Sequence, residues 1–273
     1  MMLGILEDSA GCEESMTPKF PTILLQALIG IPPIRFGDDL AGITCSALRQ
    51  MKIELKSSDI LVFAQKIVSK AEGRMIDLST VMPSVRAEKL ATVTGKDPRL
   101  VELILSESNR VVRAGEGILI VEHRLGFVMA NAGIDQSNLL DGRGDSHALL
   151  LPVDPDSSAQ RLRKQVGKRC GVEVAVLIND SFGRPWRIGT VGVAIGSAGI
   201  PSVLDMRGCS DLGGRTLRAT VVAVADEIAA SASLVMGQAA EGQPIVLVRG
   251  MTLDVPPTSA RSLIRPEGEN LFR

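Results

Sequence analysis

The chain has 273 residues, a formal net charge of -1 and 45% hydrophobic residues, so it can bury a large core and is too apolar to be disordered as a whole. It has no global excess of basic residues, and only 3% of its residues are aromatic, which disfavours nucleic-acid binding. No apolar run reaches the roughly 20 residues that cross a membrane, and early acidic residues interrupt any signal-like run. We therefore expect a cytoplasmic protein that binds neither nucleic acid nor membranes.

The predicted elements begin after a loose N-terminal extension, residues 1–20, which shows no clear periodicity. We expect residues 21–273 to form a single domain with two lobes, because no flexible linker divides them. Short apolar runs predict strands at 60–63, 117–121, 126–129, 172–178 and 244–248. Apolar residues at three- and four-residue spacings predict helices at 83–94, 97–107, 157–170 and 218–237.

A turn between residues 121 and 127 predicts a β-hairpin, so part of the sheet should be antiparallel. The predicted fold class is therefore α+β, with mixed, partly antiparallel sheets covered by helices. The four cysteines (Cys12, Cys45, Cys170 and Cys209) are widely spaced without a CxxC pair. That spacing predicts neither a zinc site nor a dense disulfide framework.

Standard catalytic and nucleotide-binding motifs are missing from the sequence. Gly95-Lys96 lacks the flanking residues of a P-loop, and no glycine pattern has dinucleotide-binding spacing. With only His123 and His147 and no nucleophile elbow, a Ser-His-Asp triad lacks its usual parts. Nucleotide binding therefore cannot be argued from a standard motif, and hydrolysis by a catalytic triad is disfavoured.

Two polar segments follow predicted strands. Asp135 and Asn138 supply a carboxylate and an amide within one turn, which suits magnesium or manganese. Asp180 and Ser181 could share a metal in the same way, and Arg184 could neutralise phosphates or a substrate carboxylate. The alternatives are a local Asx turn or helix cap for the first segment, and a polar strand exit with arginines stacked on an aromatic ring for the second.

Two further segments could bind an anion. Lys66 and Lys70 are four residues apart and would face the same phosphate if this stretch were helical, although solvated surface lysines are the alternative. The small-residue turn 237–242 follows the predicted helix 218–237, and its backbone N–H groups could approach an anion. A helix C-cap is the alternative for this turn.

The order and spacing of several stretches resemble the coenzyme F-420 glutamate ligase family from about residue 29 to residue 250. These stretches are 30–34 with 37–40, 64–73, 131–138, 180–187 and 225–230. The resemblance implies a family-specific two-lobed ligase fold, a homodimer, GTP as a substrate, and two magnesium or manganese ions. It also implies that Asp135, Asp180 and Arg184 are catalytic residues.

On the family's pattern, Asp135 and Asp180 would hold the first metal, and Ser181 and Gln238 the second. The sequence departs from that pattern twice, with Ser181 where Thr is common and Gln238 where an acid can occur. The glutamine removes one negative charge from the second metal site. The residues that the resemblance assigns to the nucleotide are Ile31, Pro32, Pro33, Ile34, Gln65, Lys66, Lys70, Asn138, Met236, Gly237, Gln238, Ala239, Ala240, Glu241 and Gly242.

The resemblance implies a ligase that joins L-glutamate to the deazaflavin precursor coenzyme F-420-0. The precursor carboxylate would be activated as an acyl phosphate by GTP, and GDP and phosphate would be released. Whether gamma-glutamyl links follow the first amide stays open. The alternatives are another nucleotide-dependent carboxylate-amine ligase on the same scaffold, and a noncatalytic dimeric binding protein.

Overall fold

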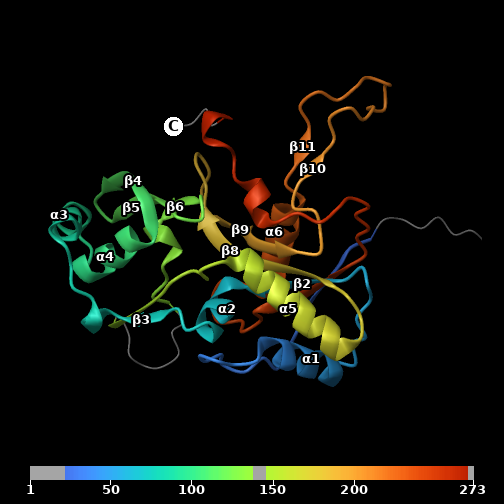
Figure 1. The fold of residues 1–273 in the computed structure, drawn as a ribbon, viewed down its shortest axis with the longest axis horizontal. Helices are drawn as coiled ribbons and strands as arrows, with labels where there is room; N and C mark the ends of the chain where they lie inside the picture. Colours follow the sequence, from blue (N-terminus) through green and yellow to red (C-terminus); the bar gives the residue numbers. More distant parts are fainter. Residues whose placement is uncertain (1–21, 138–145, 270–273) are drawn as a thin grey trace, which may run out of the picture.

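The structure is a computed structural model that describes residues 22–137 and 146–269. Its centre is a five-stranded sheet in the order β1-β12-β2-β8-β9 (Figure 1). The strands are β1 (Leu24–Ala27), β12 (Ile245–Arg249), β2 (Ile60–Ala64), β8 (Ala175–Gly183) and β9 (Thr190–Ala198). β2 and β8 are parallel, whereas the other neighbours are antiparallel. The prediction of a mixed α+β fold is confirmed.

Helices cover both faces of this sheet. Leu61 and Phe63 of β2 belong to a core that includes residues of α1 (Leu40–Gln50) and α5 (Pro155–Cys170). The intervening residues, Ile60 and Val62, belong to a second core that includes residues of α6 (Val224–Met236). Successive side chains of a strand point to opposite faces, so the unbroken apolar run 60–63 results from burial on both sides.

A three-stranded antiparallel sheet forms a second part of the molecule, seen in green at the left of Figure 1. Its strands are β4 (Ser108–Gly115), β5 (Ile118–His123) and β6 (Val128–Ala130), and its helices are α3 (Val85–Thr94) and α4 (Pro98–Ser106). Ser84 and Asp97 cap the two helices, as the backbone N–H groups of Ala87 and Arg99 donate to their side chains. The predicted hairpin is the β5–β6 connection, whereas β4 was not predicted.

Shorter elements connect these parts. α2 (Gln65–Ala71) follows β2 directly, and β3 (Met75–Asp77) pairs with β7 (His147–Leu149). β10 (Leu204–Asp205) and β11 (Val221–Val222) form an arm that protrudes from the body (Figure 1). The remaining elements are the 3-10 helices η1 (Leu78–Thr80), η2 (Asn131–Gly133), η4 (Ala260–Leu263) and η5 (Glu267–Glu269). The predicted helix 218–237 starts later, at Val224, because β11 takes part of that segment.

A buried carboxylate joins the second part of the molecule to the segment that follows α2. Glu107, the C-cap of α4, accepts a hydrogen bond at Oε2 from Arg74 Nη2 and forms an ion pair there with Arg124 Nη2, each at 3.0 Å. Burial acts to raise the pKa of Glu107, but the polar contact with His123, the charge and hydrogen bond of Arg74 and the charge of Arg124 outweigh it, and the pKa is lowered. The carboxylate is therefore charged, and it links the end of α4 to Arg74 and Arg124.

Within residues 22–137 and 146–269, each helix is too short or too polar to span a membrane. The predicted extension 1–20 lies outside the described residues. The arrangement of 21–273 as one domain with two lobes stays a prediction.

Candidate functional site

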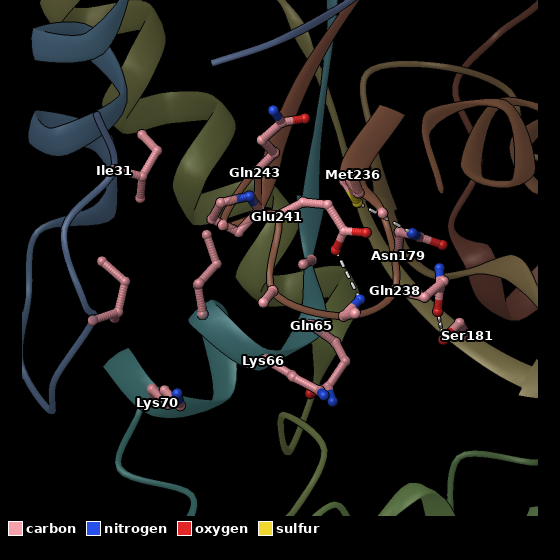
Figure 2. A pocket seen from close by; sticks show the side chains of 18 of the residues that line it. Ile31, Gln65, Lys66, Lys70, Asn179, Ser181, Met236, Gln238, Glu241 and Gln243 are labelled. Atoms are coloured by element: carbon pink, nitrogen blue, oxygen red, sulfur yellow. Dashed lines mark hydrogen bonds between the residues drawn. The ribbon is translucent and has the colours of Figure 1, made fainter. Parts of the chain in front are cut away.

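A pocket of about 430 Å³ opens where β2 and β8 end (Figure 2). Its lining includes the predicted nucleotide segments 31–34, 65–66 and 236–242, together with Lys70. Asp180 and Ser181 of β8 line the same pocket. The fold thus brings together segments that are separated by most of the length of the chain.

Asp180 lies just past the point where β2 stops, because Ala64 at the end of β2 pairs with Asn179. Its Oδ1 accepts a hydrogen bond of 2.8 Å from the backbone N–H of Ser181. The pKa of Asp180 is raised to about 7, mainly because burial penalises the charged carboxylate. The negative charge of Asp135 adds to the rise, and Lys66 opposes it, so two acidic groups from distant parts of the chain act on one another.

Asp135 is positioned by an unusual turn. Asn131, Ala132 and Gly133 all have a positive φ, of 54°, 52° and 66°, and the first two are strained because they carry a Cβ. After this turn, the backbone of Asp135 exchanges two hydrogen bonds with Leu149, of 3.0 and 2.8 Å. This left-handed turn therefore directly precedes the segment that carries the Asp135 carboxylate.

Both oxygens of the Asp135 carboxylate have partners. Oδ1 accepts a 2.6 Å hydrogen bond from the backbone N–H of Ser137, which is the local turn that we weighed as the alternative. Oδ2 forms an ion pair with Lys66 of α2. Burial acts to raise the pKa of Asp135, but the hydrogen bonds from Lys66 and Ser137 outweigh it and lower the pKa.

α2 presents the two predicted lysines to the pocket. The helix begins at once after β2, and its buried residues Gln65 and Ser69 are joined by a 2.9 Å hydrogen bond from Ser69 Oγ to Gln65 Oε1. Lys66 and Lys70 lie one turn apart and both line the pocket (Figure 2). The two lysines therefore lie on a helix, as the prediction of a shared phosphate requires.

In the turn after α6, the side chain of Glu241 folds back against the backbone of the same turn. Gly237 has φ 74°, and a Cβ there would lie 2.2 Å from Cδ of Glu241. The backbone N–H of Ala239 donates to Glu241 Oε2 at 2.8 Å (Figure 2), and hydrogen bonds from this and neighbouring backbone N–H groups lower the pKa of Glu241. Gly237 is also the C-cap of α6. The same segment therefore ends the helix and directs backbone N–H groups toward a carboxylate.

Oxygen donors converge on one side of the pocket. Ser181 Oγ donates to Gln238 Oε1 at 2.9 Å, which joins the two residues predicted for the second metal. No group of three or more His, Cys, Asp or Glu side chains gathers in the described parts of the chain. The donor set of two carboxylates, a hydroxyl and an amide still fits magnesium, which uses one or two carboxylates and completes its shell with water and substrate phosphates.

Two predicted residues that the structure describes, Asp135 and Arg184, are not among the pocket-lining residues, although Asp135 is ion-paired to Lys66, which is. Arg184 is exposed on the β8–β9 turn, where its Nη1 donates to the carbonyl of Gly189 at 3.3 Å, and it is not among the lining residues. Asn138 lies outside the described residues. Conversely, Ile67, Asn179 and the pair Gln243–Pro244 line the pocket without having been predicted as ligands. Each directly adjoins a predicted residue or segment in the sequence, and this adjacency is the feature that could have indicated them.

The chain is similar in sequence to a known family of ligases. The family model for F420-0:Gamma-glutamyl ligase matches residues 29–250. The chain belongs to this family. Among its relatives, the coenzyme F420:L-glutamate ligase of Methanothermobacter thermautotrophicus is 47% identical over 92% of this chain and 99% of that protein. The ligases of the same name from Methanopyrus kandleri and Archaeoglobus fulgidus are 44% and 41% identical, over 93% and 89% of this chain and 98% and 94% of those proteins.

The part of the chain that matches the F420-0:gamma-glutamyl ligase family contains the complete pocket lining. That lining runs from Ile31 to Pro244, inside the matched residues 29–250. Asp135 and its partner Lys66 lie within the same range.

Proposed function

We propose that the protein is a GTP-dependent ligase that adds L-glutamate to coenzyme F-420-0 through an acyl phosphate. The observation that carries this proposal is the position of Asp180 in a pocket with Lys66 and Lys70, while Lys66 is ion-paired to Asp135. This arrangement brings the Asp180 carboxylate and two lysine ammonium groups to one pocket, with a second carboxylate in contact with Lys66. It suits a polyphosphate with bound cations, and the names of the relatives indicate the reaction.

In the proposed complex, basic and backbone groups hold the phosphates. Lys66 and Lys70 approach from α2, and the turn 236–242 approaches from the other side with N–H groups that already accommodate a carboxylate. The apolar stretch 31–34 forms a separate wall of the pocket, which offers a surface to the nucleoside. The preference for GTP over ATP rests on the family alone.

Asp135 and Asp180 would hold the first divalent cation, and Ser181 and Gln238 the second. Magnesium or manganese held by these residues would supply charge neutralisation for the transferring phosphoryl oxygens. Lys66 would stabilise the same oxygens, because its ammonium group lies beside Asp135 and lines the pocket. Before the cation arrives, Lys66 and the N–H of Ser137 keep Asp135 ionised and oriented.

The reaction then needs no protein nucleophile. A carboxylate oxygen of the precursor attacks the γ-phosphorus, the bond to the β-phosphate oxygen breaks, and GDP leaves. The glutamate amine attacks the acyl carbon, phosphate leaves, and the amine gives a proton to solvent. Arg184 is exposed and lies outside the pocket lining. We therefore assign its charge to a carboxylate of an incoming substrate and not to the nucleotide phosphates.

The proposal is tested by phosphate release from GTP in the presence of manganese, with glutamate and coenzyme F-420-0 added singly and together. We expect release only when both are present, with a product heavier by one or more glutamyl residues in mass spectrometry. Phosphate release that requires an acceptor other than coenzyme F-420-0 would support the alternative of a different carboxylate-amine ligase. A protein that binds GTP without any turnover would support the noncatalytic alternative.

We also propose a symmetric homodimer, which the family resemblance implies. Large apolar side chains stand in solvent, including Leu212 on the β10–β11 arm and Ile188 on the β8–β9 turn, and such residues are commonly covered by a partner. Sedimentation at micromolar concentration should show two chains. A fully active monomer would contradict the dimer.

A further inference from the structure

Two cysteines from distant parts of the chain meet between α1 and α5. The Sγ atoms of Cys45 and Cys170 are 2.8 Å apart, although 125 positions separate the residues. This is closer than two non-bonded sulfur atoms normally pack, and it approaches the roughly 2.0 Å of a sulfur–sulfur bond. Cys45 is 7% exposed and Cys170 is half-buried.

The surrounding structure holds the two sulfur atoms together. Asp39 caps the start of α1 by accepting from the N–H of Gly42 at 3.0 Å, and it forms a 2.5 Å ion pair with Arg169. Arg169 directly precedes Cys170, the last residue of α5. Cys45 belongs to the core between the helices and the sheet, and Cys170 packs against that core. The contact is therefore a consequence of the packing of α1 against α5.

We propose that Cys45 and Cys170 are a redox-active pair that closes reversibly into a disulfide between α1 and α5, with a low-molecular-weight disulfide as the oxidant. Neither cysteine lines the pocket of the proposed ligase. The proposal therefore does not rest on the function assigned to that pocket. Sequence spacing gave no indication of it, because the two residues are brought together only by the fold.

The exchange proceeds in two balanced steps. The Cys170 thiol, which is the more exposed, loses its proton to solvent and attacks one sulfur of the small disulfide, which releases one small thiolate. Cys45 then loses its proton and attacks Cys170 Sγ, and the second small thiolate leaves. The two protein thiols are oxidised by two electrons, and the small disulfide is reduced to two thiols.

The order of these steps follows from the environment of Cys45. Burial, followed by the hydrogen bond and charge of Cys170, raises the pKa of Cys45 to about 12, although Arg169 and Arg49 act against the rise. Cys45 is therefore a poor first nucleophile toward an external oxidant. It reacts second, when Cys170 already carries the activated sulfur beside it.

The first test uses the full chain with Cys12 and Cys209 replaced by serine, so that only the proposed pair remains. The protein is incubated with oxidised glutathione, alkylated, digested and examined by mass spectrometry. We expect a peptide that joins Cys45 to Cys170 and disappears after treatment with dithiothreitol. Two alkylated cysteines, or two glutathione adducts, would overturn the proposal.

The second test measures the thermal stability of the oxidised and reduced proteins. A cross-link between such distant residues restricts the unfolded chain, and we expect oxidation to raise the melting temperature by about 10 °C. Cys45→Ala and Cys170→Ser should each abolish the rise, whereas Cys209→Ser, at an exposed cysteine, should keep it. An equal rise in Cys170→Ser would overturn the assignment.

Discussion

Lys66 of α2 forms an ion pair with Asp135 while it lines the pocket that contains Asp180. The same ammonium group thus offsets the acidic charge of the ligand-free site and stands where phosphates are proposed to bind. A cation that binds Asp135 must compete with Lys66, whereas a phosphate benefits from it. These opposite effects can be separated in one variant.

Lys66→Gln should bind manganese more tightly in the absence of nucleotide, on the order of tenfold, because a competing positive charge is removed from a partly exposed site. The same variant should lose about 100-fold in kcat/KM for GTP, because a donor to the transferring oxygens is missing. Calorimetric titration with manganese and steady-state phosphate release measure the two effects. Lys89→Gln, at an exposed position on α3, serves as the control and should change neither.

Asp180→Asn should abolish ligation with little effect on folding. We expect a loss of at least ~100-fold in rate, about 3 kcal/mol in the barrier, because the amide no longer holds a cation. Burial of the charged carboxylate is unfavourable in the ligand-free protein, so the melting temperature measured with a chelator should be unchanged or slightly higher. A variant that ligates glutamate near the parent rate would show that Asp180 is structural.

Nucleotide protection should depend on a divalent cation. Asp135 and Asp180 would repel the phosphates unless a cation bridges them, so GTP should raise the melting temperature only when magnesium or manganese is present. ATP should protect less. Differential scanning fluorimetry with and without a chelator measures this dependence, and equal protection by GTP under both conditions would contradict the cation-bridged site.

The elements that could be predicted from sequence are those with strong apolar patterns. β2, β12 and the first part of β8 are buried on both faces and appear as continuous apolar runs. β9 was missed because it contains Gly192 and Gly196, which weaken a strand pattern. The structure explains both glycines, since a Cβ at either would lie within 2.5 Å of another element, on α6 or α5.

For the candidate site, the sequence indicated which residues could bind ligands, but not which of them lie close together in space. The Asp135 and Asp180 segments were found because each follows a predicted strand, and both carboxylates do interact. The ion pair of Lys66 with Asp135 depends on how the central sheet and the three-stranded sheet are arranged, which local patterns do not encode. The contact between Cys45 and Cys170 was unpredictable for the same reason.

Gly196→Ala should destabilise the protein by about 3 kcal/mol, because the added methyl would meet the carbonyl oxygen of Pro155 at 2.4 Å, and backbone cannot move aside cheaply. Gly183→Ala on the neighbouring strand β8 is the matched control. A Cβ at Gly183 meets nothing within 4 Å, so this change should be nearly neutral. Urea unfolding compares the two, and equal stabilities would show that β9 is not held this closely against α5.

Glu107→Gln should destabilise the protein in a pH-dependent way. The neutral amide leaves Arg74 and Arg124 without their buried partner, which we expect to cost about 2 kcal/mol at pH 7, less than for a fully buried pair because Arg124 is partly exposed. The pKa of Glu107 is lowered in the folded protein. Its stabilising contribution is therefore complete above the unfolded pKa of about 4.3 and is lost as the pH falls through the folded value. Urea unfolding between pH 7 and pH 3 should show the difference between parent and variant shrinking toward acid, and a difference that stays constant would mean that the carboxylate charge does not stabilise this link.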